Sequence, residues 1–214
     1  MTTKHTGVIL AILMIASILL TAVALCGCQK ADQQAATVPV TTMDLSGTWY
    51  ADIAVKDHGT VTVKLECTAA PVTCRNFIQL AQSGFYNGLT FHRIIEGFMA
   101  QGGGPEGTGY GGSEEKIFGE FAANGYNNPL SHTRGAISMA RGGYDNDSAS
   151  SQFFIVHQDS VGLDGQYAAF GYVIQGMEVI DTICAQAQPV DGNGYIAPEA
   201  QPVIESITVR REAA

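Results

Sequence analysis

The segment FHRIIEGFMAQGG, from Phe91 to Gly103, places one guanidinium and one side-chain amide among apolar residues. The guanidinium belongs to Arg93 and the amide to Gln101. The apolar residues on either side of Glu96-Gly97 have the β-branched and aromatic character of strands, and the Glu-Gly pair favours a turn between them. We therefore expect two adjacent strands that carry a few polar groups on an otherwise apolar surface.

A second apolar stretch with a single amide follows further along the chain. It is SQFFIVH, from Ser151 to His157, and the amide is Gln152. In this order and with this spacing, the two stretches resemble the signature segments of the cyclophilin family of peptidyl-prolyl cis-trans isomerases. The resemblance continues in weaker form from about Thr48 to Arg210.

The resemblance implies a role for several residues of this sequence. Arg93, Phe98 and Gln101 form the catalytic group, in which Arg93 donates a hydrogen bond and Gln101 helps to hold Arg93 and the substrate carbonyl. The substrate-binding residues that it implies line a proline pocket or border the groove beside it: Met99, Ala140, Gln152, Phe154, Leu163 and Tyr167.

The chemistry of such a site follows from the peptide bond itself. Amide resonance opposes rotation with a barrier of about 18–20 kcal/mol, and X–Pro bonds exchange in tens to hundreds of seconds. A twisted amide localises a lone pair on the proline nitrogen, so a catalyst needs an apolar slot for the ring and a donor that keeps its proton. The guanidinium of Arg93 is such a donor at any physiological pH. No cofactor and no metal is required, and proline-containing unfolded or flexible segments are the expected partners.

Composition narrows the class of protein further. The chain has 214 residues, with 11 Lys and Arg against 20 Asp and Glu, and a formal net charge of -9. Phosphate backbones repel such a surface, so we expect no nucleic-acid partner. Only 14% of residues are charged and 25 are glycine, as is typical of a compact, turn-rich β protein. We expect a single domain that acts as a monomer.

The remaining pattern predicts about eight strands and two helices. TWYADIAV and TVTVKLE flank a Lys56–Gly59 turn and indicate a hairpin. Pro71 opens a helix whose buried face repeats at i, i+3, i+4 and i+7, and a second helix is expected from Met177 to Ala187. The fold class that follows is mostly β: a closed eight-stranded antiparallel β-barrel capped by two helices, as the cyclophilin resemblance also implies.

The N-terminus has the pattern of a secretory signal. Lys4 and His5 precede an uncharged apolar run from Val8 to Leu25. The run ends in Leu25-Cys26-Gly27-Cys28, which resembles a bacterial lipobox with Cys28 as the lipidated residue. Cys26 fits less well because the large Leu25 precedes it. An uncleaved membrane anchor and simple secretion are the alternatives, and all three place the domain outside the cytoplasm.

Three segments result from this interpretation: a lipoprotein signal peptide at 1–27, a flexible tether at 28–46 and the cyclophilin-like isomerase domain at 47–214. The tether is rich in Gln, Ala, Thr and Val and shows no period. The cysteines beyond Cys28 are Cys67, Cys74 and Cys184. Cys67 and Cys74 are candidates for a disulfide across a strand-to-helix turn, but burial of all three as small hydrophobes is the favoured interpretation.

The predicted function is acceleration of X–Pro rotation during the folding of extracytoplasmic proteins, by a non-covalent mechanism. Glu96 stands where Pro is common in the family. Two further residues depart from the family pattern: Gly162 stands where well-known members carry Trp, and Arg141 where Asn is common. These departures leave room for an alternative, a membrane-tethered proline-binding adaptor or holdase with little turnover. A structural module with a dead groove would predict substitutions at Arg93 or Phe98, and the sequence has neither.

Overall fold

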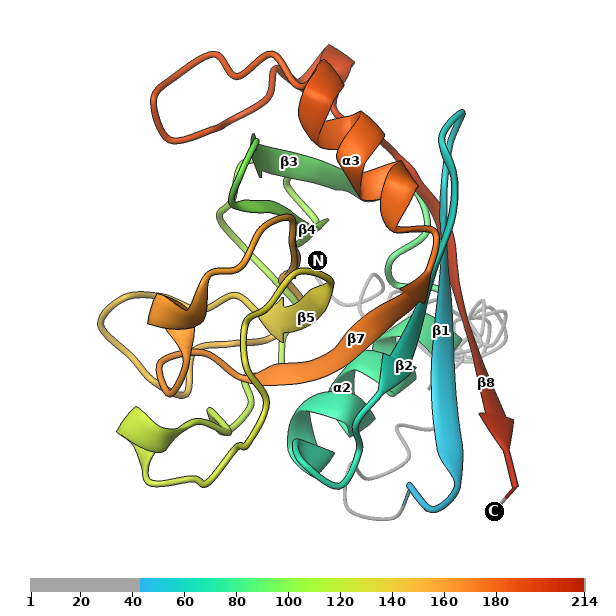
Figure 1. The fold of residues 1–214 in the computed structure, drawn as a ribbon, viewed down its shortest axis with the longest axis vertical. Coiled ribbons are helices and arrows are strands. Elements are labelled where there is room, and N and C mark those ends of the chain that lie inside the picture. Colours follow the sequence, from blue (N-terminus) through green and yellow to red (C-terminus); the bar gives the residue numbers. More distant parts are fainter. Residues whose placement is uncertain (1–42, 214) are drawn as a thin grey trace, which may run out of the picture. The chain divides into compact units, whose positions relative to one another are not determined.

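The computed structural model describes residues 43–213 (Figure 1). The predicted signal peptide, Cys28 and nearly all of the predicted tether lie outside these residues, so those assignments stay predictions. Within the described part of the chain, no helix is long and apolar enough to cross a bilayer.

Eight strands and two α-helices make up this part of the chain. The strands are β1 (Thr48–Val55), β2 (Gly59–Leu65), β3 (Thr90–Ile95), β4 (Met99–Gly104), β5 (Ala136–Met139), β6 (Phe153–Val156), β7 (Ala169–Gln175) and β8 (Ile204–Glu212). The helices are α2 (Pro71–Gln82) and α3 (Met177–Gln186), and short 3-10 turns occur at Ala122–Asn124, Val161–Leu163 and Pro198–Ala200.

All strands form one antiparallel sheet in the order β3-β4-β6-β5-β7-β2-β1-β8. The sheet curls into an open half-barrel with α2 and α3 packed beside it (Figure 1). The predicted eight strands, two helices and antiparallel pairing are confirmed, and so is the β1–β2 hairpin.

The predicted closure of the barrel is wrong. The two edge strands, β3 and β8, meet only where β8 begins: Ile204 donates its N–H to Leu89 O, and Thr90 forms a single bridge with Val203. Pro202, one residue earlier, has no N–H with which to continue a ladder. From Ile204 onward β8 pairs with β1 instead, and the loop before it lies along β3.

The core fills the concave side of this sheet and explains why the helices form where they do. Helix α2 starts at Pro71, as predicted, and buries Cys74, Phe77, Ile78 and Ala81. The ring of Phe77 lies 5.1–5.6 Å from the rings of Tyr86, Phe153 and Phe170, in tilted or edge-on contacts that stabilise aromatic clusters. This cluster fixes β6 and β7 against α2, and β6 carries part of the groove.

The three cysteines of the described chain are free thiols. Cys67, Cys74 and Cys184 are all buried within the main core. Their predicted role as small buried hydrophobes is confirmed.

Candidate functional site

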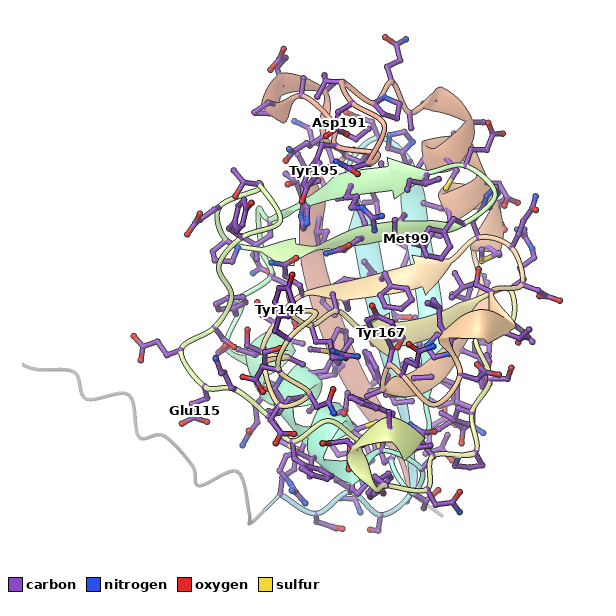
Figure 2. All side chains as sticks on the ribbon, turned by 90° about the vertical axis from the view of Figure 1, so that its left-hand side faces the viewer. Met99, Glu115, Tyr144, Tyr167, Asp191 and Tyr195 are labelled. Atoms are coloured by element: carbon purple, nitrogen blue, oxygen red, sulfur yellow. The ribbon has the colours of Figure 1, made fainter. Side chains whose placement is uncertain are left out.

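A groove of about 470 Å³ lies over β3, β4 and β6 and the loops that follow them. Eight predicted site residues line it: Arg93, Phe98, Met99, Gln101, Ala140, Phe154, Leu163 and Tyr167. Gly109, Arg141 and Tyr195 complete the lining. Figure 2 shows Met99, Tyr167 and Tyr195 on this face of the half-barrel. Most residues that line the groove were thus predicted from the sequence. The individual roles of these residues stay predictions.

One main-chain oxygen and one side-chain oxygen hold the guanidinium of Arg93 in the groove. Arg93 on β3 lies opposite Gln101 on β4, because the Glu96-Gly97 turn sets that register. Its Nη1 donates to Gln101 Oε1 at 3.2 Å, and its Nε donates to the main-chain oxygen of Asn193 at 2.8 Å. Nη1 also lies 3.7 Å from Met99 Sδ. These contacts use at most three of the five guanidinium N–H donors, so donors remain for a ligand.

A chain of amides continues from Gln101 into the glycine-rich loop that follows β4 and contains Gly107, Gly109, Gly111 and Gly112. Gln101 Nε2 donates to Gln152 Oε1 at 2.9 Å, and Gln152 Nε2 donates to the main-chain oxygens of Gly109 and Gly111 at 3.0 and 2.8 Å. Gln152 is 8% exposed and lies behind Gln101, not among the lining residues. Gln152 therefore supports Gln101 through one hydrogen bond, and its predicted place at the border of the groove stays a prediction.

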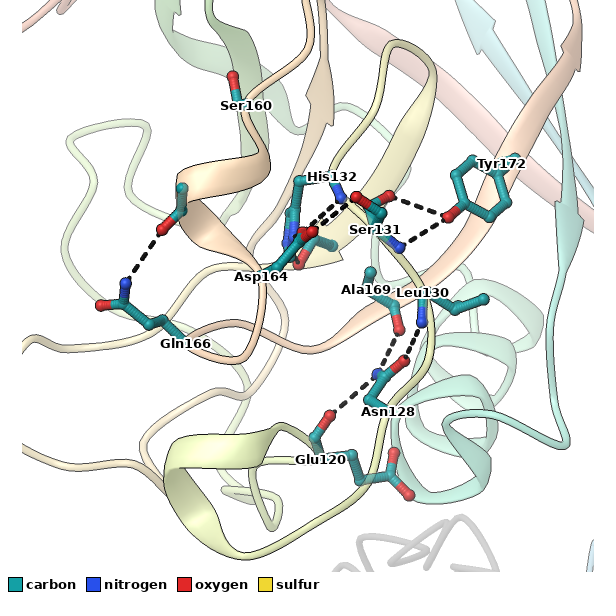
Figure 3. A network of polar contacts seen from close by, with 12 residues as sticks. Glu120, Asn128, Leu130, Ser131, His132, Ser160, Asp164, Gln166, Ala169 and Tyr172 are labelled. Carbon is teal, nitrogen blue, oxygen red and sulfur yellow. Dashed lines mark hydrogen bonds and ion pairs between the residues drawn. The ribbon is translucent and has the colours of Figure 1, made fainter.

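The apolar end of the groove is built around Phe154. The rings of Phe154 and Tyr167 meet edge-on, with centroids 5.9 Å apart, and His132 stacks on the other side of Phe154 at 5.9 Å. Figure 3 shows how His132 is fixed, with Asp164 accepting from its main-chain N–H at 2.7 Å and contacting its Nδ1 at 2.8 Å. Its Nε2 lies 2.9 Å from Ser138 Oγ. His132 and Asp164, which support this apolar wall of the groove, are not among the predicted site residues.

Arg141 adds a second cation to the lining of the groove. Its guanidinium carbon lies 5.0 Å from the ring centroid of Tyr167 and 5.1 Å from that of Phe121, within the range of cation–π attraction. Its Nε donates to the main-chain oxygen of Gln166 at 3.0 Å. Neither Arg93 nor Arg141 forms an ion pair with a carboxylate among residues 43–213. The groove is therefore locally cationic in an acidic protein.

Asn193 and Tyr195 were missed as site residues. The Asp-Gly-Asn-Gly sequence before Tyr195 indicates a loop. The contact to Arg93 is made by a main-chain carbonyl, which every residue type has, so the sequence does not reveal it. Tyr195 reaches the groove because its loop forms a bridge with Arg93. Only the chain path between α3 and β8 brings these residues beside β3.

His92, next to Arg93 on β3, is an imidazole enclosed in the core. It is fully buried, and neither ring nitrogen has a hydrogen-bond partner among the residues that the structure describes. Burial first, and then the charge of Arg93, lower the pKa of His92 from 6.5 to about 4. In the unfolded chain the same imidazole takes up its proton near pH 6.5.

We expect the free energy of unfolding to fall as the pH drops from about 6.5 to about 4, since only the unfolded state binds this proton there. The contribution of His92 between pH 7 and pH 5 is about 2 kcal/mol. Urea unfolding at both pH values, with the parent and His92→Gln, measures it as the difference between the two pH slopes. Equal slopes in the two proteins would assign the acid sensitivity to other groups.

Comparisons with known proteins agree with this geometry. Residues 50–209 match the family described as cyclophilin type peptidyl-prolyl cis-trans isomerase/CLD. A peptidyl-prolyl cis-trans isomerase of Helicobacter pylori is 45% identical over 142 residues, which cover 65% of this chain and 83% of the relative. Peptidyl-prolyl cis-trans isomerase B of Bacillus subtilis is 46% identical over 124 residues, which cover 58% of this chain and 82% of the relative.

A solved structure is similar over most of the domain. It is a cyclophilin type peptidyl-prolyl cis-trans isomerase of Cryptosporidium parvum, determined in the presence of the dipeptide Ala-Pro. Its TM-score is 0.67 at 30% identity, and the match covers 76% of this chain and 99% of that one. The resemblance predicted from the two sequence stretches and the predicted enzyme class are both confirmed. This chain belongs to the cyclophilin-type peptidyl-prolyl cis-trans isomerase family.

Proposed function

We propose that this chain accelerates X–Pro rotation in extracytoplasmic proteins, with Arg93 as the donor to the twisted amide and a lipid on Cys28 as the membrane tether. The observation that carries the mechanism is the state of Arg93. Its guanidinium is fixed by Asn193 and Gln101, has donors to spare, and borders the apolar wall formed by Phe154.

The mechanism needs no bond to be made or broken except hydrogen bonds. The proline ring enters the apolar part of the groove beside Met99, Phe154 and Leu163, where burial favours it over water. As the amide twists, conjugation is lost and the proline nitrogen gains a lone pair. A charged N–H of Arg93 then hydrogen-bonds to that nitrogen more strongly than to the planar ground state, so it lowers the barrier. The structure of a protein with the same fold was determined in the presence of Ala-Pro, which supports this type of ligand.

A refolding experiment tests the proposed role in folding. The substrate is a secreted protein whose slow refolding phase is limited by an X–Pro bond, a step of tens of seconds. Full-length chain at substoichiometric concentration is expected to accelerate that phase, and Arg93→Ala is expected to accelerate it far less. An adaptor or holdase would instead change the refolding only at stoichiometric concentration, and equally in both proteins.

The tether is supported by the lipobox-like Leu25-Cys26-Gly27-Cys28 sequence. In cells supplied with labelled fatty acid, we expect the parent and Cys26→Ser to carry the label and to fractionate with the membrane. Cys28→Ser is expected to lose the label. A label that persists in Cys28→Ser, or a parent that is never labelled, would contradict lipidation at this residue.

A further inference from the structure

Among residues 43–213, the acceptor for Arg93 Nε comes from outside the sheet. Gln101, which holds Nη1, is fixed by the β3–β4 ladder. The Asn193 carbonyl, which holds Nε, belongs to the loop between α3 and β8. The position of a loop carbonyl depends on the contacts that hold its peptide. These contacts therefore affect the orientation of the Arg93 guanidinium.

The carboxylate of Asp191 holds that peptide from both sides. Its Oδ1 accepts from the main-chain N–H of Asn193 at 2.9 Å and from that of Tyr195 at 3.1 Å. Its Oδ2 lies 3.3 Å from Asn193 Nδ2. The two amides flank the carbonyl that faces Arg93, so this side chain helps to fix its direction, beside the main-chain bond from the Gly194 N–H to Asp191 O at 3.4 Å. Figure 2 places Asp191 and Tyr195 in the same loop, above the strand that carries Met99.

Separate contacts attach this loop to β3. Ile94 donates its N–H to Gly194 O at 2.8 Å, and Ile196 donates to His92 O at 3.0 Å. Gly194 has φ +88°, and a Cβ there would lie 2.4 Å from Ile95 Cγ1. Because these contacts do not involve Asp191, the loop stays on β3 without it. Loss of Asp191 then disturbs the Asn193 carbonyl locally.

Tyr195 connects the loop that contains Asp191 to the glycine-rich loop. A Cβ placed on Gly109 would lie 2.6 Å from the Tyr195 hydroxyl, so the tyrosine ring packs directly against the glycine-rich loop. That loop is also held by Gln152, which in turn holds Gln101. The contacts that hold Arg93 through Asn193 and those that hold it through Gln101 therefore both lead to Gly109.

We infer that Asp191 is a positioning residue for Arg93, acting through the main-chain carbonyl of Asn193. Asp191 does not line the groove. The inference rests on the proposed role of Arg93, because only then does the aim of its guanidinium affect the rate. It predicts that the residue at 191 must accept hydrogen bonds from N–H groups but does not need a negative charge.

The test compares Asp191→Ala with Asp191→Asn in the full-length chain. Asparagine keeps a side-chain oxygen that can accept from the same two N–H groups, and alanine does not. In Ala-Pro isomerisation we expect Asp191→Ala to lose about fivefold in kcat with little change in KM, comparable to one neutral hydrogen bond. Asp191→Asn is expected to stay within about twofold of the parent.

Asp44→Ala provides the matched control. Asp44 Oδ1 accepts from the Ser46 N–H at 2.9 Å in a turn of the same kind, and its carboxylate pairs with Arg211 on β8, outside the groove. We expect this variant to isomerise at the parent rate. A loss equal to that of Asp191→Ala would mean that any such turn affects the rate through general stability, and would overturn the inference.

A readout independent of turnover separates this inference from the proposed function. Hydrogen exchange of the Arg93 Nε–H, followed by NMR, is expected to speed up in Asp191→Ala and to stay slow in Asp191→Asn. If exchange responds in this way but the parent shows no isomerisation, the proposed function fails and the positioning stands. Unchanged exchange and unchanged kcat in Asp191→Ala would overturn the positioning itself.

Discussion

Replacing Arg93 with alanine is expected to lower kcat/KM for an Ala-Pro peptide by about 10- to 100-fold. A hydrogen bond to a charged donor contributes roughly 1.5–3 kcal/mol, and each 1.36 kcal/mol is a factor of about ten in rate. The residual rate comes from the apolar wall, which remains and still excludes water from the amide. The loss should fall mainly on kcat, because the bond to Arg93 strengthens as the amide twists.

Two further variants sharpen this prediction. Arg93→Lys keeps the charge but loses the planar fork that contacts Asn193 and Gln101 together, so an intermediate rate is expected. Arg210→Ala removes an arginine that stacks on Tyr50 at 4.1 Å, outside the groove, and should leave the rate unchanged. An Arg93→Ala rate within twofold of the parent would exclude Arg93 as the donor.

The second large effect is expected on stability, at Glu120. This glutamate is fully buried, and its Oε1 and Oε2 accept from the N–H groups of Val72 and Thr73 at 3.0 and 2.8 Å. Those groups open α2, where Ala70 provides no side-chain cap. The carboxylate thus satisfies two unpaired N–H donors and also faces the positive end of the helix dipole. Figure 3 shows that the main chain of Glu120 is held as well, by Asn128.

We expect Glu120→Ala to lower the free energy of unfolding by about 3 kcal/mol, since two charge-assisted hydrogen bonds are lost and two buried donors are left unpaired. Glu120→Gln keeps one acceptor and should lose about half as much. Urea titration with an unchanged m-value measures both. Glu115→Ala, at an exposed position of the same loop, should change the stability by less than about 0.5 kcal/mol. A similarly small change in Glu120→Ala would contradict the capping role.

The parts of this fold that depend on local pattern were predictable. Pro71 and the spacing from Cys74 to Ala81 define α2, because a helix repeats its buried face every three to four residues. The Glu96-Gly97 turn places Arg93 opposite Gln101, because strand register follows from the turn between the strands. The apolar wall came from the family resemblance, since residues as distant as Met99 and Leu163 have no local relation.

Closure of the barrel and the supports of the site were not predictable in the same way. Whether β3 and β8 pair depends on where one ladder stops, and that depends on the lone missing N–H of Pro202 and on the pairing of β8 with β1. The contacts from Glu120 to α2 and from Asn193 to Arg93 join segments far apart in the sequence. In the second case a main-chain atom makes the contact, and any residue type carries that atom.

Catalysed exchange of an Ala-Pro peptide, followed by NMR with the full-length chain, tests the central claim most directly. Exchange spectroscopy measures binding and cis–trans interconversion in one sample and needs no coupled protease. We predict that a catalytic amount of the chain brings the cis and trans signals into exchange far faster than the uncatalysed tens of seconds. Peptide that binds in the groove yet interconverts at the uncatalysed rate would contradict catalysis and favour a proline-binding adaptor.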